Sequence, residues 1–445
     1  MSKGQNLDKR MSIVALAWPI LIEILLRTAL GTSDVFMLSG YSDQAVSAVG
    51  VITQITFFLI IVSTFVSSGT GILIARYNGE GRHSDSTHVG VASIWLSFAI
   101  GALLSGLAIM VAVYFIPLYG LEAQVEQYAK DYLLISGVMT FNVTVGIVLT
   151  TILRSHGYSR APMVVNLISG VLNVAGNYLA LYQPFGLPVY GVQGVAIATV
   201  ASQVIGTLML VWIAKHSPIA LPLNQGKQVP KPIYKSILKI GGMNGGEVLS
   251  YNLAQICIVY FVVQMGTASL AAFTYAQNIA RFSFAFALAV GQASQIQAGY
   301  YIGRGWVESI YKRVHRYFLI GFVVSTMMSV FFYLNRDLIL PIFTDQEEIL
   351  LLASSLLLGS IVLEAGRVFN LIYISALKGA GDVKFPVQMG ILSMWGLSVT
   401  MSYILGIHWG WGVIGAWMAT ALDEWVRGII MAYRWRSRCW VNTKV

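Results

Sequence analysis

The chain has 445 residues, of which 56% are hydrophobic and 11% are charged, and its net charge is +9. About a quarter of the residues of a soluble domain are charged, so this composition excludes a soluble globule and indicates a membrane protein. The positive charge does not indicate nucleic-acid binding, because the basic residues are not gathered in one patch but are distributed over the polar segments that separate the apolar ones.

Apolar segments long enough to cross a bilayer, about 20 residues each, follow one another along the chain. The first, at 11–38, is longer than the apolar region of a secretory signal and lacks a cleavage site of small residues, so we expect it to remain as a helix. The sequence predicts an all-α integral membrane protein with twelve transmembrane helices, at 13–38, 47–73, 89–116, 130–152, 161–183, 190–214, 237–264, 270–299, 317–342, 349–377, 385–407 and 411–433.

The basic residues predict the orientation of these helices. Of the 28 Lys and Arg residues, 22 fall at the two termini and in every second polar segment, whereas acidic residues such as Asp43 and Glu122 occur in the other segments. Positive residues stay on the cytoplasmic side of a membrane. We therefore expect both termini in the cytoplasm and the protein in the plasma membrane, the inner membrane of a prokaryote.

The two halves of the chain repeat one another. The longest polar segment, 216–236, carries four prolines and is the predicted linker between an N-lobe (1–215) and a C-lobe (237–445). An offset of 224 residues aligns segment 77–81 with 301–305, segment 153–162 with 377–386, and Glu23 with Glu247. Six helices in each half predict parallel repeats, an arrangement typical of transporters that work by alternating access.

A run of glycines at 241–246 precedes Glu247. Small residues allow helices in a membrane to pack closely. The alternative is a locally opened turn beside the carboxylate, and we favour close packing.

The sequence contains no spacing typical of a metal site or a catalytic triad, and no phosphate-binding loop for ATP. We expect no enzymatic activity, no cofactor, and no metal site other than one for Na⁺. The candidates for function are charges inside the membrane, which are costly to bury. Pairs three or four residues apart on one helix are Glu23 with Arg27 and Glu364 with Arg367. Asp423 and Glu424 can likewise pair with Arg427, which we interpret as structural.

Asp34 has no cation within four residues, and the aligned residue of the second half is Ile258. An isolated carboxylate in a membrane helix suits a site that is reversibly protonated or binds Na⁺; the alternative is a carboxylate that faces the water outside. Asn173, Asn177 and Thr199 offer further oxygen ligands, although such groups also bond neighbouring helices to one another.

The motifs and their order resemble the multidrug and toxic compound extrusion family over nearly the whole chain. The segments that carry the resemblance are 34–40, 48–50, 77–81, 153–162, 173–177, Glu247 and 377–386, of which 379–386 is the most specific. The resemblance implies antiport of small organic compounds, often cationic and aromatic, against H⁺ or Na⁺. It also implies a cation site at Asp34, Asn173, Asn177 and Thr199, and a second cation or substrate site at Glu247 and Glu364.

This sequence departs from the family at several positions, among them Arg76 and Asn78, which replace commoner residues after the second predicted helix. Asn177 stands where some members have an aspartate, which leaves the choice between H⁺ and Na⁺ open, and Arg367 lies close enough to Glu364 to neutralise it.

We expect a monomer in the lipid bilayer. A flippase for a lipid-linked precursor is one alternative. A membrane-embedded enzyme that uses Glu23, Glu247 or Glu364 as acid–base groups is a weaker one.

Overall fold

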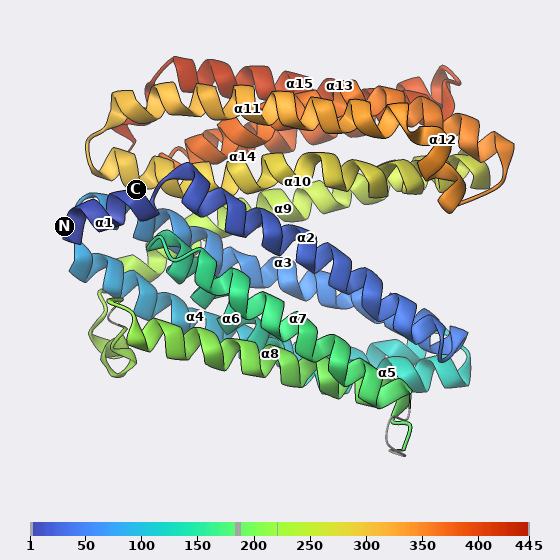
Figure 1. The fold of residues 1–445 in the computed structure, drawn as a ribbon, viewed down its shortest axis with the longest axis horizontal. Coiled ribbons are helices and arrows are strands. Elements are labelled where there is room, and N and C mark those ends of the chain that lie inside the picture. The colour runs from blue at the N-terminus through green and yellow to red at the C-terminus, as the bar shows by residue number, and fades with distance from the viewer. Residues whose placement is uncertain (1–2, 183–187, 220, 444–445) are drawn as a thin grey trace. The chain divides into compact units, whose positions relative to one another are not determined.

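The computed structural model describes residues 3–182, 188–219 and 221–443, and this part of the chain is helical, with no β-strand (Figure 1). The apolar core of a bilayer offers no water to bond the backbone N–H and C=O groups, and a helix satisfies these groups within its own segment. Long apolar segments therefore fold as helices. The predicted all-α fold is confirmed.

The chain divides into two compact units: unit 1 comprises Met1–Asn78 and Arg82–Gly245, and unit 2 comprises Gly79–Gly81 and Gly246–Val445. In the first half, with η for 3-10 and π turns, the elements are α1 (Lys3–Arg10), α2 (Ile13–Ser39), α3 (Asp43–Gly79), α4 (His83–Met110), η1 (Val111–Phe115), η2 (Ile116–Tyr119), α5 (Ala123–Val138), α6 (Thr140–Ser155), α7 (Arg160–Leu181) and α8 (Gly191–His216). After these come η4 (Leu223–Gln228), α9 (Lys231–Gln264), α10 (Thr267–Gly303), α11 (Val307–Leu334), α12 (Arg336–Ile339), η5 (Leu340–Ile342), α13 (Glu347–Gly379), α14 (Lys384–Ser393), η6 (Met394–Val399), η7 (Ser402–His408), α15 (Gly412–Arg436) and η8 (Cys439–Asn442).

These elements account for the twelve predicted spans. Within the described residues, nine helices are long and apolar enough to cross a membrane by themselves, and α5 and α6 together form a tenth span that bends by 48°. The other two are α10 and α15, which carry more polar side chains, including Gln292 and Gln295 on α10 and Asp423 and Glu424 on α15. Several helices extend beyond the predicted windows, because a helix can continue from the hydrocarbon into the polar surface of the bilayer.

Helix α9 begins at Lys231, inside the segment expected as the linker. Pro232 lies in its first turn, where proline is tolerated because the backbone N–H has no partner there. The glycines at 241–246 do not open this helix. A Cβ atom added at Gly241 would lie 2.0 Å from the backbone oxygen of Phe65 on α3. Gly241 and Gly245 therefore serve close packing of α9 on α3, as favoured from the sequence, whereas Gly242 and Gly246 have no atom within 4 Å of an added Cβ.

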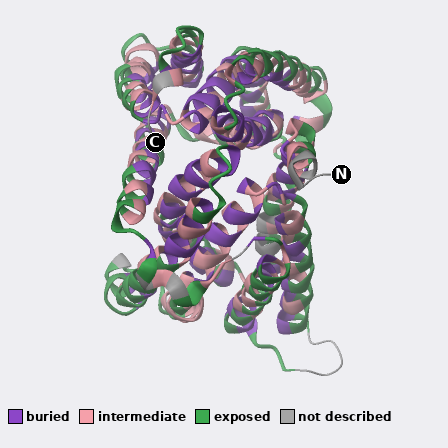
Figure 2. Cartoon of the chain, turned by 90° about the vertical axis from the view of Figure 1, so that its left-hand side faces the viewer, coloured by how far each residue is buried: buried purple, intermediate pink, exposed green. Residues whose placement is uncertain are grey.

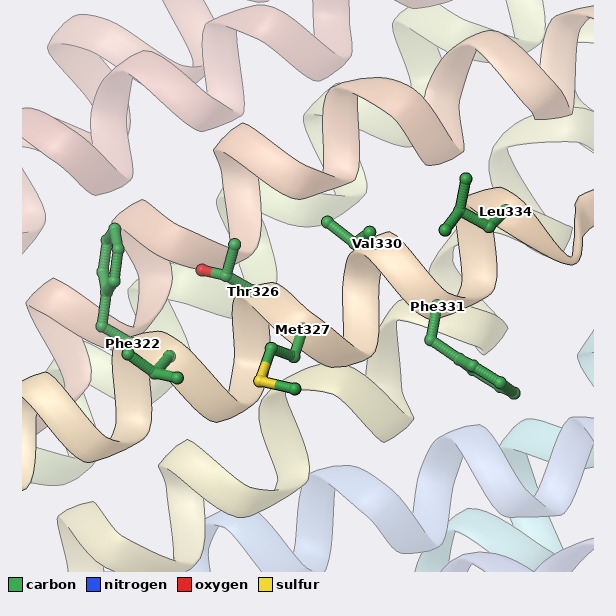
Figure 3. A pocket seen from close by; sticks show the side chains of 7 residues that line it. Phe322, Thr326, Met327, Val330, Phe331 and Leu334 are labelled. Atoms are coloured by element: carbon green, nitrogen blue, oxygen red, sulfur yellow. The ribbon is translucent and has the colours of Figure 1, made fainter.

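Many large apolar side chains of the helices are exposed, and the cartoon in Figure 2 colours the exposed residues green. On α11, a shallow groove is lined only by side chains of that helix, six of them apolar, with Thr326 as the single polar one (Figure 3). Met327 and Leu334 are each 67% exposed. A ligand site needs polar groups converging from several elements, so this face of α11 is a surface for lipid contact.

Candidate ion and substrate sites

The residues of the predicted cation site lie on α2, α7 and α8 of unit 1. Asp34 is on α2, but its side chain falls outside the described part of the structure. Asn173 on α7 donates a hydrogen bond from Nδ2 to Oγ1 of Thr199 on α8, at 3.0 Å. Asn177, one turn further along α7, is completely buried. An amide and a hydroxyl from two helices therefore meet inside unit 1.

Helix α2 packs directly on α7. The space beside Gly170 of α7 is filled by Leu30 of α2, whose side chain would lie 2.4 Å from an added Cβ atom. Leu30 and Asp34 are four residues apart and share a helix face. The backbone of α2 thus brings Asp34 to the helix that carries Asn173 and Asn177.

Glu23 pairs mainly with a residue from another helix. Its Oε1 lies 3.5 Å from Nη2 of Arg27, the predicted partner, but the Arg27 side chain is 69% exposed. Its Oε2 accepts a close hydrogen bond from Nη2 of Arg154 at the end of α6, whose side chain is 15% exposed. Because Glu23 is itself buried, the stronger of the two pairs is the one with Arg154.

Unit 2 contains the same pair at the aligned positions. Lys378, at the end of α13, donates a close hydrogen bond from Nζ to Oε2 of Glu247 on α9. Each pair joins residues 131 positions apart. The sequence repeat already aligned Glu23 with Glu247 and Arg154 with Lys378, so the signal was present. The contacts within these two pairs were not predicted, because the pairing rules applied to the sequence compare only residues within one or two turns of the same helix.

His156 follows the pair in unit 1, at the end of α6 and outside the predicted span. Its Nε2 lies 3.2 Å from the hydroxyl of Ser86, and its Nδ1 lies 2.8 Å from the carbonyl oxygen of Ile152. Burial lowers the pKa of His156 to about 4, with a smaller contribution from the charge of His83. The imidazole is therefore neutral at pH 7.

In unit 2, charged side chains of α13 and α15 form a connected network. Arg367 donates from Nη1 to Oε1 of Glu364 at 2.6 Å, and its Nε lies 3.7 Å from Oε1 of Glu424. Nη2 of Arg427 lies 2.7 Å from Oδ2 of Asp423 and 3.1 Å from Oε1 of Glu424. The network therefore includes the Glu364–Arg367 pair and the three charges of α15, and it joins these two helices.

Two neutral side chains extend the network. Asn370 on α13 donates from Nδ2 to Oε2 of Glu424 at 2.9 Å, and the hydroxyl of Ser393 on α14 donates to Oδ1 of Asp423. Three acids and two arginines thus share their hydrogen bonds inside unit 2. Within the described residues, no three His, Cys, Asp or Glu side chains are grouped so that they could hold a metal ion.

A cavity of about 540 Å³ opens beside this network, and the described residues that line it all belong to unit 2. Its wall is formed by one face each of α9, α10, α13 and α15. The charged side chains at the wall are Glu247, Arg281, Arg367, Lys378, Glu424 and Arg427. Aromatic side chains complete it, and Phe273 and Trp417 meet edge to face at 5.4 Å between ring centres. Sequence reasoning did not place the polar face of α10 at a cavity.

Comparison with known proteins identifies the family. A family model named MatE matches residues 19–179 and 245–404, which is most of the chain and part of both halves. The chain belongs to the MatE family. The resemblance to multidrug and toxic compound extrusion proteins is thereby confirmed, and so is the expectation that the protein is a membrane transporter and not an enzyme.

Relatives of this MatE protein match it over nearly their whole length. An uncharacterized transporter of Bacillus subtilis, YisQ, is 38% identical over 440 residues, which cover 98% of this chain and 96% of the relative. A probable multidrug resistance protein of Thermotoga maritima, NorM, is 24% identical over 452 residues, covering 100% and 96%. A crystal structure of a MATE protein in its bent conformation matches with a TM-score of 0.90, 21% identity and 98% coverage of each chain, and it shows the same fold.

Proposed function

We propose that this MatE protein exports small organic compounds, cationic and aromatic ones among them, in exchange for H⁺ or Na⁺. The proposal rests on the family, on the name of the Thermotoga relative and on the duplicated chain. In this proposal the N-lobe (1–215) and the C-lobe (237–445) rock against each other in alternating access. The protein works as a monomer in the plasma membrane, with both termini in the cytoplasm.

The coupling ion binds, in this proposal, at Asp34 together with Asn173, Asn177 and Thr199. The observation that carries it is the hydrogen bond from Asn173 to Thr199, which brings polar groups of α7 and α8 together beside the helix that carries Asp34. Carboxylate, amide and hydroxyl oxygens are ligands that suit a hard cation. A carboxylate at the same place also suits reversible protonation. Binding of either ion neutralises Asp34 and shifts the balance between the two states of the transport cycle.

Glu247 and Glu364, the expected second site, have a different role in this proposal. Lys378 already occupies Oε2 of Glu247, and Arg367 occupies Oε1 of Glu364. At either place a coupling cation would lie beside the positive charge that already neutralises the carboxylate, and this charge opposes its binding. We therefore assign both carboxylates to the structure of the C-lobe. The pair of Glu247 with Lys378 joins α9 to α13, and Glu364 pairs with Arg367 within α13.

The test is transport in everted membrane vesicles, with a fluorescent organic cation and an imposed Na⁺ or pH gradient. We expect Asp34→Asn to abolish gradient-driven transport. The matched control is Asp43→Asn, because Asp43 is an exposed carboxylate at the start of α3 and its replacement should leave transport unchanged. Equal transport by the two variants would show that Asp34 does not couple the ion. Failure of the wild type to move any compound of a varied panel would show that the protein is not an organic-compound exporter.

A further inference from the structure

The cavity in unit 2 presents more positive than negative side chains to its interior. Four basic residues line it, Arg281, Arg367, Lys378 and Arg427, against two acidic ones, Glu247 and Glu424. The other two acids of this region do not line the cavity. Glu364 is 0% exposed and Asp423 is 1% exposed. A set of side chains that is neutral in total therefore shows a net positive face to an occupant.

Arg281 is the basic residue of this wall that remains available. Arg367, Lys378 and Arg427 all donate hydrogen bonds to carboxylates. Arg281 is exposed, and it makes no hydrogen bond or ion pair with any described residue. A guanidinium on a membrane-spanning helix is costly without a counter-charge and marks a functional site by default. An anionic group in the cavity would supply that counter-charge.

Two buried N–H groups at the wall also have no acceptor. They are Nε1 of Trp417 and Nε of Arg427, and neither has a hydrogen-bond partner among the described residues. Both groups can only donate. One acceptor at the wall, Oδ1 of Asn370, is likewise without a partner. Among these three buried atoms without a partner, two are donors and one is an acceptor. Buried donors are normally satisfied, so these atoms favour an occupant that carries acceptor oxygens.

The acids of the wall do not favour an organic cation. Oε2 of Glu247 is bonded to Lys378, and the oxygens of Glu424 are bonded to Asn370 and Arg427. A cation that approached these carboxylates would compete with the basic groups already paired with them and would also meet the charge of Arg281. An anion finds Arg281 free and breaks none of them.

We propose that this cavity binds a small aromatic compound that carries a carboxylate or sulfonate group. The anionic group lies on Arg281, and the ring packs against aromatic side chains of the wall, including Phe284, which is one helix turn from Arg281. The volume of about 540 Å³ is in the range of sites for small organic molecules. Binding of this compound does not depend on the proposed function, whereas its export rests on the proposed function.

The experiment compares two probes with the same ring and opposite charge, 2-naphthoate and 2-naphthylmethylammonium. Equilibrium binding is measured on the full chain in phosphatidylcholine nanodiscs, with empty nanodiscs as the background. We expect saturable binding of 2-naphthoate and weaker binding of the ammonium compound. Arg281→Gln should weaken 2-naphthoate binding by about tenfold or more, the usual loss when a hydrogen bond to a charged group is removed.

Two further variants separate charge from structure. Arg281→Lys retains the positive charge and should keep most of the affinity for 2-naphthoate. Arg316→Gln is the matched control, because Arg316 is an exposed arginine on α11 that does not line the cavity, and it should bind as the wild type does. Since Arg281 has no partner to lose, Arg281→Gln should also unfold at the wild-type temperature.

Wild-type affinity in Arg281→Gln, or equal affinity for the two probes, would overturn the proposal. A lowered unfolding temperature in Arg281→Gln would also count against it, because the arginine would then be structural. Gradient-driven export of 2-naphthoate from everted vesicles is measured separately. If the protein binds 2-naphthoate but exports no compound, this result contradicts the proposed function and still supports the binding site.

Discussion

The pair of Glu247 with Lys378 offers a strict test of how the C-lobe is held together. The perturbation is Lys378→Met, which keeps the length of the side chain and removes its charge. Glu247 would then remain as a carboxylate that is 9% exposed and has lost its main hydrogen-bond donor. Removing one partner of a fully buried pair costs about 3–5 kcal/mol. Lys378 is 14% exposed, so water compensates in part, and we expect a loss of about 2–4 kcal/mol.

The assay is thermal unfolding of the purified protein, followed by tryptophan fluorescence. For a unit of about 200 residues, 1 kcal/mol shifts the midpoint by about 2–4 °C, so a fall of at least about 4 °C is expected. Glu247→Gln combined with Lys378→Met should recover part of the loss, because the double variant leaves no unpaired charge. The control is Lys384→Met, since Lys384 is exposed and makes no ion pair with a described residue. The reasoning fails if Lys378→Met and Lys384→Met have the same unfolding midpoint, or if the double variant is less stable than both single variants.

Two more predictions concern unit 1. The pKa of His156 is lower in the folded protein, about 4, than its ordinary value of 6.5, so the stability it contributes is present above pH 6.5 and is lost as the pH falls toward 4. His156→Gln should reduce the loss of unfolding free energy between pH 7 and pH 4 by up to about 3 kcal/mol. The measurement is the unfolding midpoint of the wild type and the variant across this pH range. Parallel curves for the two proteins would refute the prediction. Gly241→Ala should prevent normal folding, because the new Cβ would overlap the backbone of Phe65, whereas Gly242→Ala meets no atom within 4 Å and should be tolerated. The yield of monodisperse protein distinguishes them, and similar yields would contradict the packing argument.

The sequence was sufficient for the fold because membrane helices follow from local composition. The length and composition of each apolar segment are properties of neighbouring residues, and they predicted the all-α architecture. The repeat added long-range information, since it aligned Glu23 with Glu247 and Arg154 with Lys378. It did not say that the members of each pair touch. That contact depends on which faces of α2 and α6, or of α9 and α13, pack together, and periodicity does not determine this.

The candidate sites show the same limit more clearly. Arg367 was expected beside Glu364 because the two are three residues apart on one helix, and the structure has this pair at 2.6 Å. The link from Arg367 to Glu424, on a different helix, was not predicted. Arg281 was not among the residues expected to form a site. Its position at a cavity depends on four helices at once, so no motif in the chain could reveal it.

The separation of 131 residues within each carboxylate–cation pair also bears on biosynthesis. A ribosome adds about 5–20 residues per second, so Glu23 is made roughly 7–26 seconds before Arg154. During that interval the cation nearest in sequence on α2 is Arg27, four residues from Glu23, which lies 3.5 Å from it in the folded protein. Glu247 has no cation three or four residues away on α9. The carboxylate of Glu247 therefore has no partner on the neighbouring turns of its own helix until Lys378 has been synthesised.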